Sequence, residues 1–153
     1  SSVKVGFLRI KPFTYKYLLG TINMHILTRR PLGGNKEADR TIVYDSLIKG
    51  SCFVAHDGLY PAKGFRFFFQ TDKGKKIIEM GNEGICSPGI IVIRSPAYCL
   101  MKIIQDGNVL SQSYGNKLSK RIYEKGVYRA ELYRKTPYFG WRPWIFSNPV
   151  YLK

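Results

Sequence analysis

The stretch that decides the fold covers residues 90–112, IIVIRSPAYCLMKIIQDGNVLSQ. Apolar, β-prone residues lie on both sides of Asp106–Gly107, a dipeptide that favours a two-residue hairpin turn. Ser95–Pro96 interrupts the first of these runs. We therefore predict strands over residues 90–93, 98–105 and 109–112, with the last two joined by the Asp-Gly turn.

Similar short β-prone runs, separated by turns, recur along most of the chain. In residues 127–134, apolar and polar positions alternate, with Tyr128, Ala130 and Leu132 on one face, as in a half-buried antiparallel strand. Further short β-prone runs cover residues 52–55, 64–70, 76–80, 144–146 and 150–152. Seven or eight strands at spacings of roughly 8–12 residues are typical of a sandwich. We predict a mainly β protein, an antiparallel immunoglobulin-like β-sandwich over residues 50–153.

The first 49 residues have a helical pattern and form the second predicted unit. From about Thr14 to Leu27 the apolar positions recur at intervals of three and four, which predicts an amphipathic helix. Arg29–Arg30 suits its C-terminus. A second helix is expected to follow an Asn35 N-cap and to end at Gly50 in the C′ position. We therefore expect two α-helices before the sandwich.

Composition narrows the classes of function. Of the 153 residues, 44% are hydrophobic, enough to build a core, and the formal net charge is +15. No apolar run reaches about 18 residues, so no membrane-spanning helix is expected. The three cysteines lack CxxC spacing, which favours reduced thiols and a cytoplasmic location. Two histidines are too few for a multi-histidine metal centre, so we expect no metal or other cofactor in this chain.

Several stretches together resemble one protein family. They are the segment from Pro31 to Arg40, LIKGSCFVAHDGLYPAKGFRF (47–67), GNEG (81–84), IIQDGNVL (103–110), GVYRAELY (126–133) and RPWIFSNPVYL (142–152). Their order and spacing resemble the C-terminal portion of PHP-domain proteins, the polymerase and histidinol phosphatase superfamily of metal-dependent phosphoesterases, in the CehA/McbA-like branch.

The resemblance implies that a longer parent protein has separate catalytic and accessory domains. Residues 1–49 would be the last helices of a metal-binding β/α barrel, and residues 50–153 an appended sandwich. The family's metal ligands lie in motifs upstream of this region, so no catalytic or metal-binding residue is carried over. The expected function is a non-catalytic accessory domain, with divalent metals only in the parent's catalytic domain and the upstream barrel as partner. Helices left uncovered could instead pair in a homodimer.

Two places in the chain are candidates for a partner or ligand surface. His56–Asp57 falls in a predicted turn after the first sandwich strand, and adjacent strand residues point to opposite faces rather than forming a dyad. Trp141 and Arg142 lie in an aromatic, Gly/Pro-containing segment that could stack on a sugar or a protein. In both places ordinary packing is the competing interpretation.

The excess of basic residues offers an alternative function. Residues 49–153 hold 17 basic and 7 acidic side chains. A polyanion patch can be drawn from Lys117, Lys120, Arg121, Lys125, Arg129, Arg134 and Lys135, interleaved with tyrosines. Basic grooves with aromatic platforms bind single-stranded nucleic acid. A stand-alone domain that binds nucleic acid, another polyanion or, less favoured, carbohydrate is therefore the alternative to the accessory domain.

Overall fold

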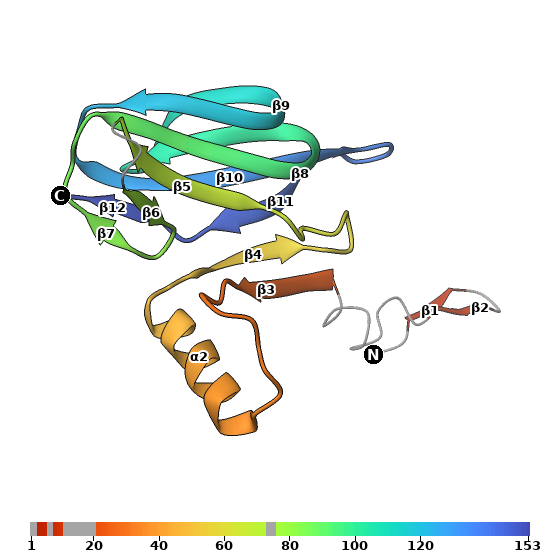
Figure 1. Cartoon of the computed structure of the whole chain (residues 1–153). Coiled ribbons are helices and arrows are strands. Elements are labelled where there is room, and N and C mark those ends of the chain that lie inside the picture. The colour runs from red at the N-terminus through yellow and green to blue at the C-terminus, as the bar shows by residue number, and fades with distance from the viewer. Residues whose placement is uncertain (1–2, 6–7, 11–20, 73–75) are drawn as a thin grey trace.

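The computed structural model describes residues 3–5, 8–10, 21–72 and 76–153, the first two groups by backbone alone. It contains one 13-residue helix, α2, and a set of strands that are mostly antiparallel (Figure 1). In chain order the elements are β1 (Val3–Val5), β2 (Leu8–Ile10), β3 (Ile22–Ile26), α2 (Lys36–Ile48), β4 (Cys52–His56), β5 (Arg66–Thr71), β6 (Ile77–Glu79), β7 (Glu83–Gly84), β8 (Gly89–Gln105), β9 (Asn108–Ile122), β10 (Gly126–Thr136), β11 (Gly140–Ser147) and β12 (Val150–Leu152).

Ten of these strands belong to one sheet, and its main path runs β3-β4-β11-β10-β8-β5-β6. β9 pairs with β8, and β12 pairs with β10 and with β7. Among the described residues, the short β7–β12 contact is the only parallel pairing. β1 and β2 form a separate antiparallel pair. The prediction of a mainly β, antiparallel protein is confirmed.

The β8–β9 hairpin organises this sheet, and the Asp106–Gly107 turn forms as predicted. Both turn residues have positive φ, 47° and 90°, as tight hairpin turns require. The first part of β8 pairs with β5 and the last part with β10, while β9 follows both parts. The predicted break at Ser95–Pro96 is instead an irregularity inside one long strand, between the pairs formed by Arg94 and Cys99.

The buried residues form one core cluster, to which strands on both sides of this hairpin contribute. Phe67, Ile93 and Met101 are fully buried in one cluster with Tyr128 and Trp144 from the C-terminal strands. The polar groups of the two large aromatic residues, Tyr128 and Trp144, both have hydrogen-bond partners. The Tyr128 hydroxyl donates to the Glu124 carbonyl, and the Trp144 indole N–H donates to the Tyr60 carbonyl, each at 2.8 Å. The alternation predicted for residues 127–134 is confirmed, because Tyr128, Ala130 and Leu132 are buried.

The first predicted helix is wrong from Ile22 onward. Ile22–Ile26 is strand β3, which pairs with β4 at the edge of the sheet. Residues 14–20, the rest of that prediction, lie outside the described residues. Arg29 and Arg30 are exposed in the loop after β3 and do not end a helix. Helical spacing misled here because Ile22, Met24 and Ile26 also fit a period of two.

The second predicted helix is confirmed in its details. The Asn35 side chain accepts a hydrogen bond from the Ala38 amide and caps α2, while Gly50 adopts φ +68° just after the helix. α2 nevertheless stands apart from the sheet (Figure 1). Ser46 is its only buried residue, so local capping, rather than packing, defines this helix.

Candidate functional site

A concave site opens on the face of the sheet formed by β8, β9, β10 and β11. It has a volume of about 530 Å³ and is lined by Tyr98, Tyr114, Arg134, Lys135 and Trp141, and we call it the Trp141 pocket. The rings of Tyr114 and Trp141 meet at 5.3 Å between centroids, tilted by 42°. Tyr98 and Tyr114 expose 68% and 56% of their surface, so the aromatic faces remain available to a ligand.

Arg134 is held in place at this pocket by aromatic rings. Its guanidinium lies 4.3 Å from the centre of the Tyr60 ring and 5.3 Å from that of Trp144. It also donates a hydrogen bond to the Tyr98 carbonyl at 3.4 Å. Stacking of this kind fixes the planar cation without neutralising its charge.

Two further cations extend the positive charge along the β10–β11 hairpin. Arg142 lies directly opposite Arg134, and Lys135 lies opposite Trp141. Arg142 stacks on Phe139, with its guanidinium carbon 5.3 Å from the ring centre. Arg134 and Arg142 therefore place two like charges directly opposite each other, an arrangement that destabilises a sheet. Among the described residues, none of these three cations forms an ion pair with a carboxylate.

The pocket therefore joins residues from two separate sequence predictions. Trp141 came from the partner-surface hypothesis, while Arg134 and Lys135 came from the polyanion patch. Arg142 lies next to Trp141 in the chain but is not part of the pocket lining. Tyr114 is one of the tyrosines that accompany the predicted basic patch, whereas Tyr98 belongs to neither prediction.

The other members of the predicted polyanion patch are dispersed. Arg121 pairs with Asp72 at 2.8 Å, and Arg129 pairs with Glu131 at 2.7 Å. Lys117 and Lys120 are exposed on β9, and Lys125 is exposed in the turn before β10. These five residues do not line the Trp141 pocket.

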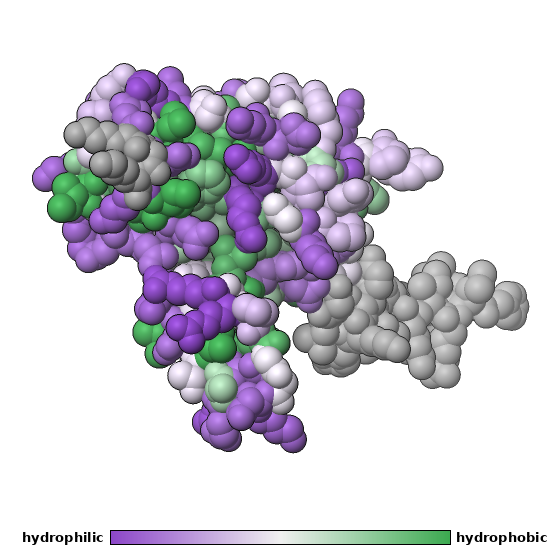
Figure 2. Space-filling view, viewed as in Figure 1, coloured by the Kyte–Doolittle hydropathy of each residue, from purple (hydrophilic) through white to green (hydrophobic). Residues whose placement is uncertain are grey.

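A second positive group lies across β5, β8 and β9. The strand register places Arg66 opposite Arg94, and Arg94 opposite Lys117, so three cations form one cross-strand row. Hydrophilic residues gather over this face of β5 and β8 in Figure 2. In the part of the chain that the structure describes, no carboxylate forms an ion pair with these three residues.

Asp57 contacts His25, a residue 32 positions away in the sequence. Its carboxylate accepts hydrogen bonds from the Asn23 amide at 2.8 Å and the Ala62 backbone N–H at 2.9 Å, and it contacts His25 Nε2 at 2.8 Å. Burial raises the pKa of Asp57, but these hydrogen bonds and the His25 charge outweigh it and leave the pKa below its usual range. The cluster ties β3 to the turn after β4.

The neighbouring histidine plays no part in that cluster. His56 ends β4, and its Nδ1 atom is buried without a hydrogen-bond partner among the described residues. His25, expected in a helix, lies on β3 and stacks on Phe53 with 4.7 Å between ring centroids. Because Asp57 joins His25 to Asn23 and a backbone amide, its geometry is that of a structural clamp.

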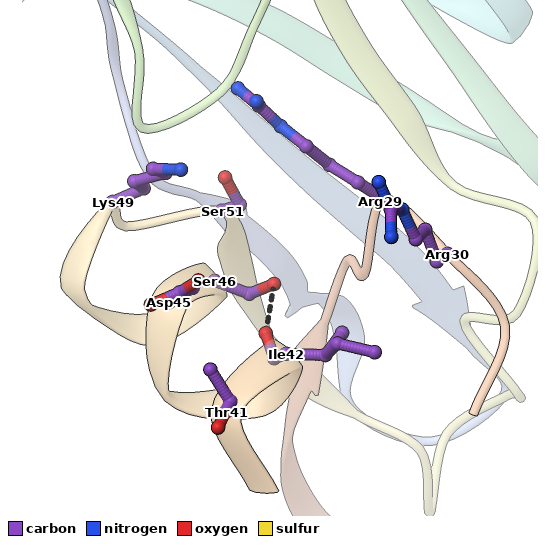
Figure 3. A pocket seen from close by; sticks show the side chains of 8 residues that line it. All are labelled: Arg29, Arg30, Thr41, Ile42, Asp45, Ser46, Lys49 and Ser51. Carbon is purple, nitrogen blue, oxygen red and sulfur yellow. Dashed lines mark hydrogen bonds between the residues drawn. The ribbon is translucent and has the colours of Figure 1, made fainter. Parts of the chain in front are cut away.

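A second concave site separates α2 from the loop after β3. It measures about 370 Å³, and Figure 3 shows Arg29 and Arg30 on the loop with Ile42 and Ser46 on the helix. The Ser46 hydroxyl already donates to the Ile42 carbonyl at 2.9 Å. The site also lies beside the C-terminal end of α2, where the helix dipole disfavours anions.

The described residues contain neither a metal-binding cluster nor a membrane-spanning helix. No three His, Cys, Asp or Glu side chains there lie close enough to hold a metal ion. No described helix is long and apolar enough to cross a membrane. All three cysteines are free, and burial raises the pKa of the Cys52 and Cys99 thiols, although hydrogen bonding and Arg134 partly offset the effect at Cys99.

Comparison of the chain with protein-family models, with curated proteins and with solved structures finds no significant match.

Proposed function

We propose that this chain is a non-catalytic accessory domain that docks through α2 onto a preceding catalytic domain. The observation that carries the proposal is a contrast in burial. The strands from β4 onward share one closed core, whereas α2 exposes Tyr44, Leu47 and Ile48, the last by 83%. Hydrophobic residues are visible on the surface of α2 in Figure 2. Apolar helix faces are normally buried against another element.

The shape of this surface supports the same proposal. A shallow groove of about 480 Å³ runs along Val43, Tyr44 and Leu47, and nearby Leu32 is also exposed. The resemblance to PHP-type phosphoesterases supplies the occupant, a β/α barrel whose last helices would continue into α2. Residues 1–49 would then connect the barrel to the appended domain of residues 50–153, with β3 pairing with β4 at the edge of the sheet of that domain.

The proposal extends to the finer fold. The bend of β8 and β9 gives the sheet two parts, one built around β5 and the other around β10 and β11. We propose that these parts act as the two layers of an immunoglobulin-like sandwich, because residues from both enter one core.

Paired substitutions test the docking surface. Ile48 on α2 and Ile85 after β7 expose 83% and 78% of their surface, so Ile48→Asp and Ile85→Asp are matched changes. In the natural full-length protein, Ile48→Asp should destabilise by about 1.5–3 kcal/mol, the value of burying one such side chain. Ile85→Asp should stay within about 0.5 kcal/mol. Thermal and urea unfolding measure both.

Three outcomes would distinguish a preceding barrel from a second copy of this chain as the partner that covers α2. A natural protein whose intact mass equals that of this chain would remove the barrel as partner. Equal, negligible effects of the two substitutions in a longer natural protein would contradict docking through α2. A concentration-dependent dimer of this chain in light scattering, abolished by Ile48→Asp, would identify a second copy as the occupant instead.

A second candidate function is polyanion binding, and the row of Arg66, Arg94 and Lys117 favours it. Three neighbouring cations without carboxylate partners repel one another, and a bound polyanion would relieve that repulsion. Binding of a fluorescent single-stranded oligonucleotide should weaken linearly with the logarithm of salt concentration. Lys117→Gln should lower that slope, and an unchanged slope would count against the row.

A further inference from the structure

We infer that the Trp141 pocket binds a nucleobase together with its phosphate group. This site is independent of docking through α2, and it goes beyond the polyanion candidate by assigning a specific pocket. Its five lining residues come from four strands, so the fold, rather than a single loop, sets their arrangement. The observations that carry the inference are aromatic exposure, unneutralised charge and size.

The aromatic walls supply the surface for a base. Trp141 and Tyr114 support each other at 5.3 Å between centroids, and each keeps more than a third of its surface exposed. Tyr98 adds a third ring at 68% exposure. Exposed aromatic rings that are fixed by neighbours stack on bases of any sequence, because every base has a π-face.

The cations decide between a nucleotide and a neutral sugar. Arg134 is fixed between Tyr60 and Trp144, and Lys135 lies opposite Trp141 at the rim. Both side chains are hydrogen-bond donors only, and among the described residues that line the pocket the hydroxyls of Tyr98 and Tyr114 are the only side-chain acceptors, with no carboxylate or amide beside them. A sugar needs acceptors as well as donors for its hydroxyls. A phosphate needs donors and positive charge, which this pocket supplies.

The dimensions agree with a ligand of this size. A volume of about 530 Å³ lies within the range of pockets that bind small molecules, roughly 300–1,000 Å³. Two kinds of ligand present a base together with its phosphate: a free mononucleotide, or one nucleotide of a single strand lying across the sheet.

The test measures binding of a fluorescein-labelled dT8 oligonucleotide by polarisation, with AMP, adenosine and inorganic phosphate as competitors. Trp141→Ala should weaken dT8 binding about tenfold or more through lost stacking. Tyr138→Ala, on the same hairpin but 90% exposed and outside the pocket, should change it less than twofold. Lys135→Gln and Lys125→Gln each remove one positive charge. Because only Lys135 lines the pocket, only Lys135→Gln should lower the affinity for dT8, by about threefold or more. Circular dichroism confirms that each variant is folded.

The competitors identify the source of the nucleotide. AMP that binds as tightly as dT8, and at least tenfold better than adenosine or phosphate, assigns the pocket to mononucleotides. dT8 that binds tenfold tighter than AMP assigns it to single strands. The inference is overturned if Trp141→Ala and Tyr138→Ala behave alike, if dT8 does not bind at low salt, or if a neutral oligosaccharide binds and dT8 does not. A loss confined to Lys117→Gln would retain the polyanion candidate and reject this pocket.

Discussion

Asp57 links β3 to the turn after β4 through side-chain contacts, in addition to the backbone pairing of β3 with β4. Its carboxylate joins Asn23 and His25 on β3 to the Ala62 backbone amide, three contacts of 2.8–2.9 Å. Hydrogen bonds to a charged group are stronger than neutral ones, and the loss of one partner leaves the others unsatisfied. This side chain therefore reinforces the backbone pairing of β3 with β4 and the stacking of His25 on Phe53.

The lowered pKa of Asp57 predicts a dependence of stability on acid. A group whose folded pKa lies below its unfolded value stabilises the protein above the unfolded pKa, about 4. That contribution disappears as the pH falls through the folded pKa. Asp57→Asn should therefore destabilise the protein by about 1–3 kcal/mol at pH 7 and by clearly less at pH 3. Urea unfolding at the two pH values measures this; a difference that does not change with pH would contradict it.

The sequence predicts local structure well where a single residue type dictates the backbone. Asn35, Gly50 and Asp106–Gly107 were assigned correctly, because caps and tight turns depend on nearby atoms. Asp57 could not be assigned from the sequence, since its partner His25 lies 32 positions away on a strand expected to be helical. A lone carboxylate beside a histidine carries no signal about distant contacts.

At the scale of elements, two bulges decide where the candidate site forms. In β8–β9 the register shifts by one residue between Ile103 and Ile104, which places Tyr114 opposite Leu100. Without that shift, Tyr114 would lie opposite the buried Cys99, on the core side, because a one-residue slip reverses every side chain. A second shift in β10–β11, between Leu132 and Tyr133, sets Trp141 opposite Lys135.

These shifts explain why the pocket could be predicted only in part. The aromatic segment identifies Trp141 as a candidate and the run of basic residues identifies Arg134 and Lys135, yet no short-range motif gives the position of a bulge. Pro143 is the nearest signal, because proline within a sheet favours edges and bulges. The dispersal of Lys117, Lys120 and Arg121 from the pocket follows from the same long-range register.

The junction between α2 and β4 provides a test at the same scale. Gly81 has φ +82°, and a Cβ atom there would lie 2.3 Å from the Gly50 carbonyl carbon and oxygen. Backbone atoms cannot move aside cheaply, so Gly81→Ala should cost about 3 kcal/mol or more, from left-handed strain and overpacking together. Gly107→Ala has a similar φ of +90° but open space, and should cost only about 1–2 kcal/mol.

Urea unfolding of both glycine variants separates the two causes. The difference between them reports mainly the clash with the Lys49–Gly50 backbone, because the φ angles of the two glycines are nearly the same. Equal losses would show that the junction relaxes to admit a methyl group. That result would leave the position of α2 relative to β4 loosely determined.

Over the whole molecule, stability is distributed unevenly. The strands from β4 to β12 enclose fully buried side chains such as Phe69, Ile91 and Leu132, whereas α2 buries only Ser46. A 13-residue helix with so little packing is marginal in water. The sheet should therefore fold and persist by itself, with α2 stabilised mainly by its cap and by whatever covers its apolar side.

Hydrogen exchange of the monomeric chain tests this division directly. Amides in β8 and β10 should exchange slowest, through global unfolding, because both are central strands with buried side chains. Amides of Lys36–Ile48 should exchange at least a hundredfold faster, by local opening of α2. Adding the partner domain, or measuring the natural full-length protein, should slow exchange in α2 and leave β8 unchanged. Protection of α2 equal to that of β10 in a confirmed monomer would show that the helix is stable without a partner, and the burial contrast behind the docking proposal would lose its force.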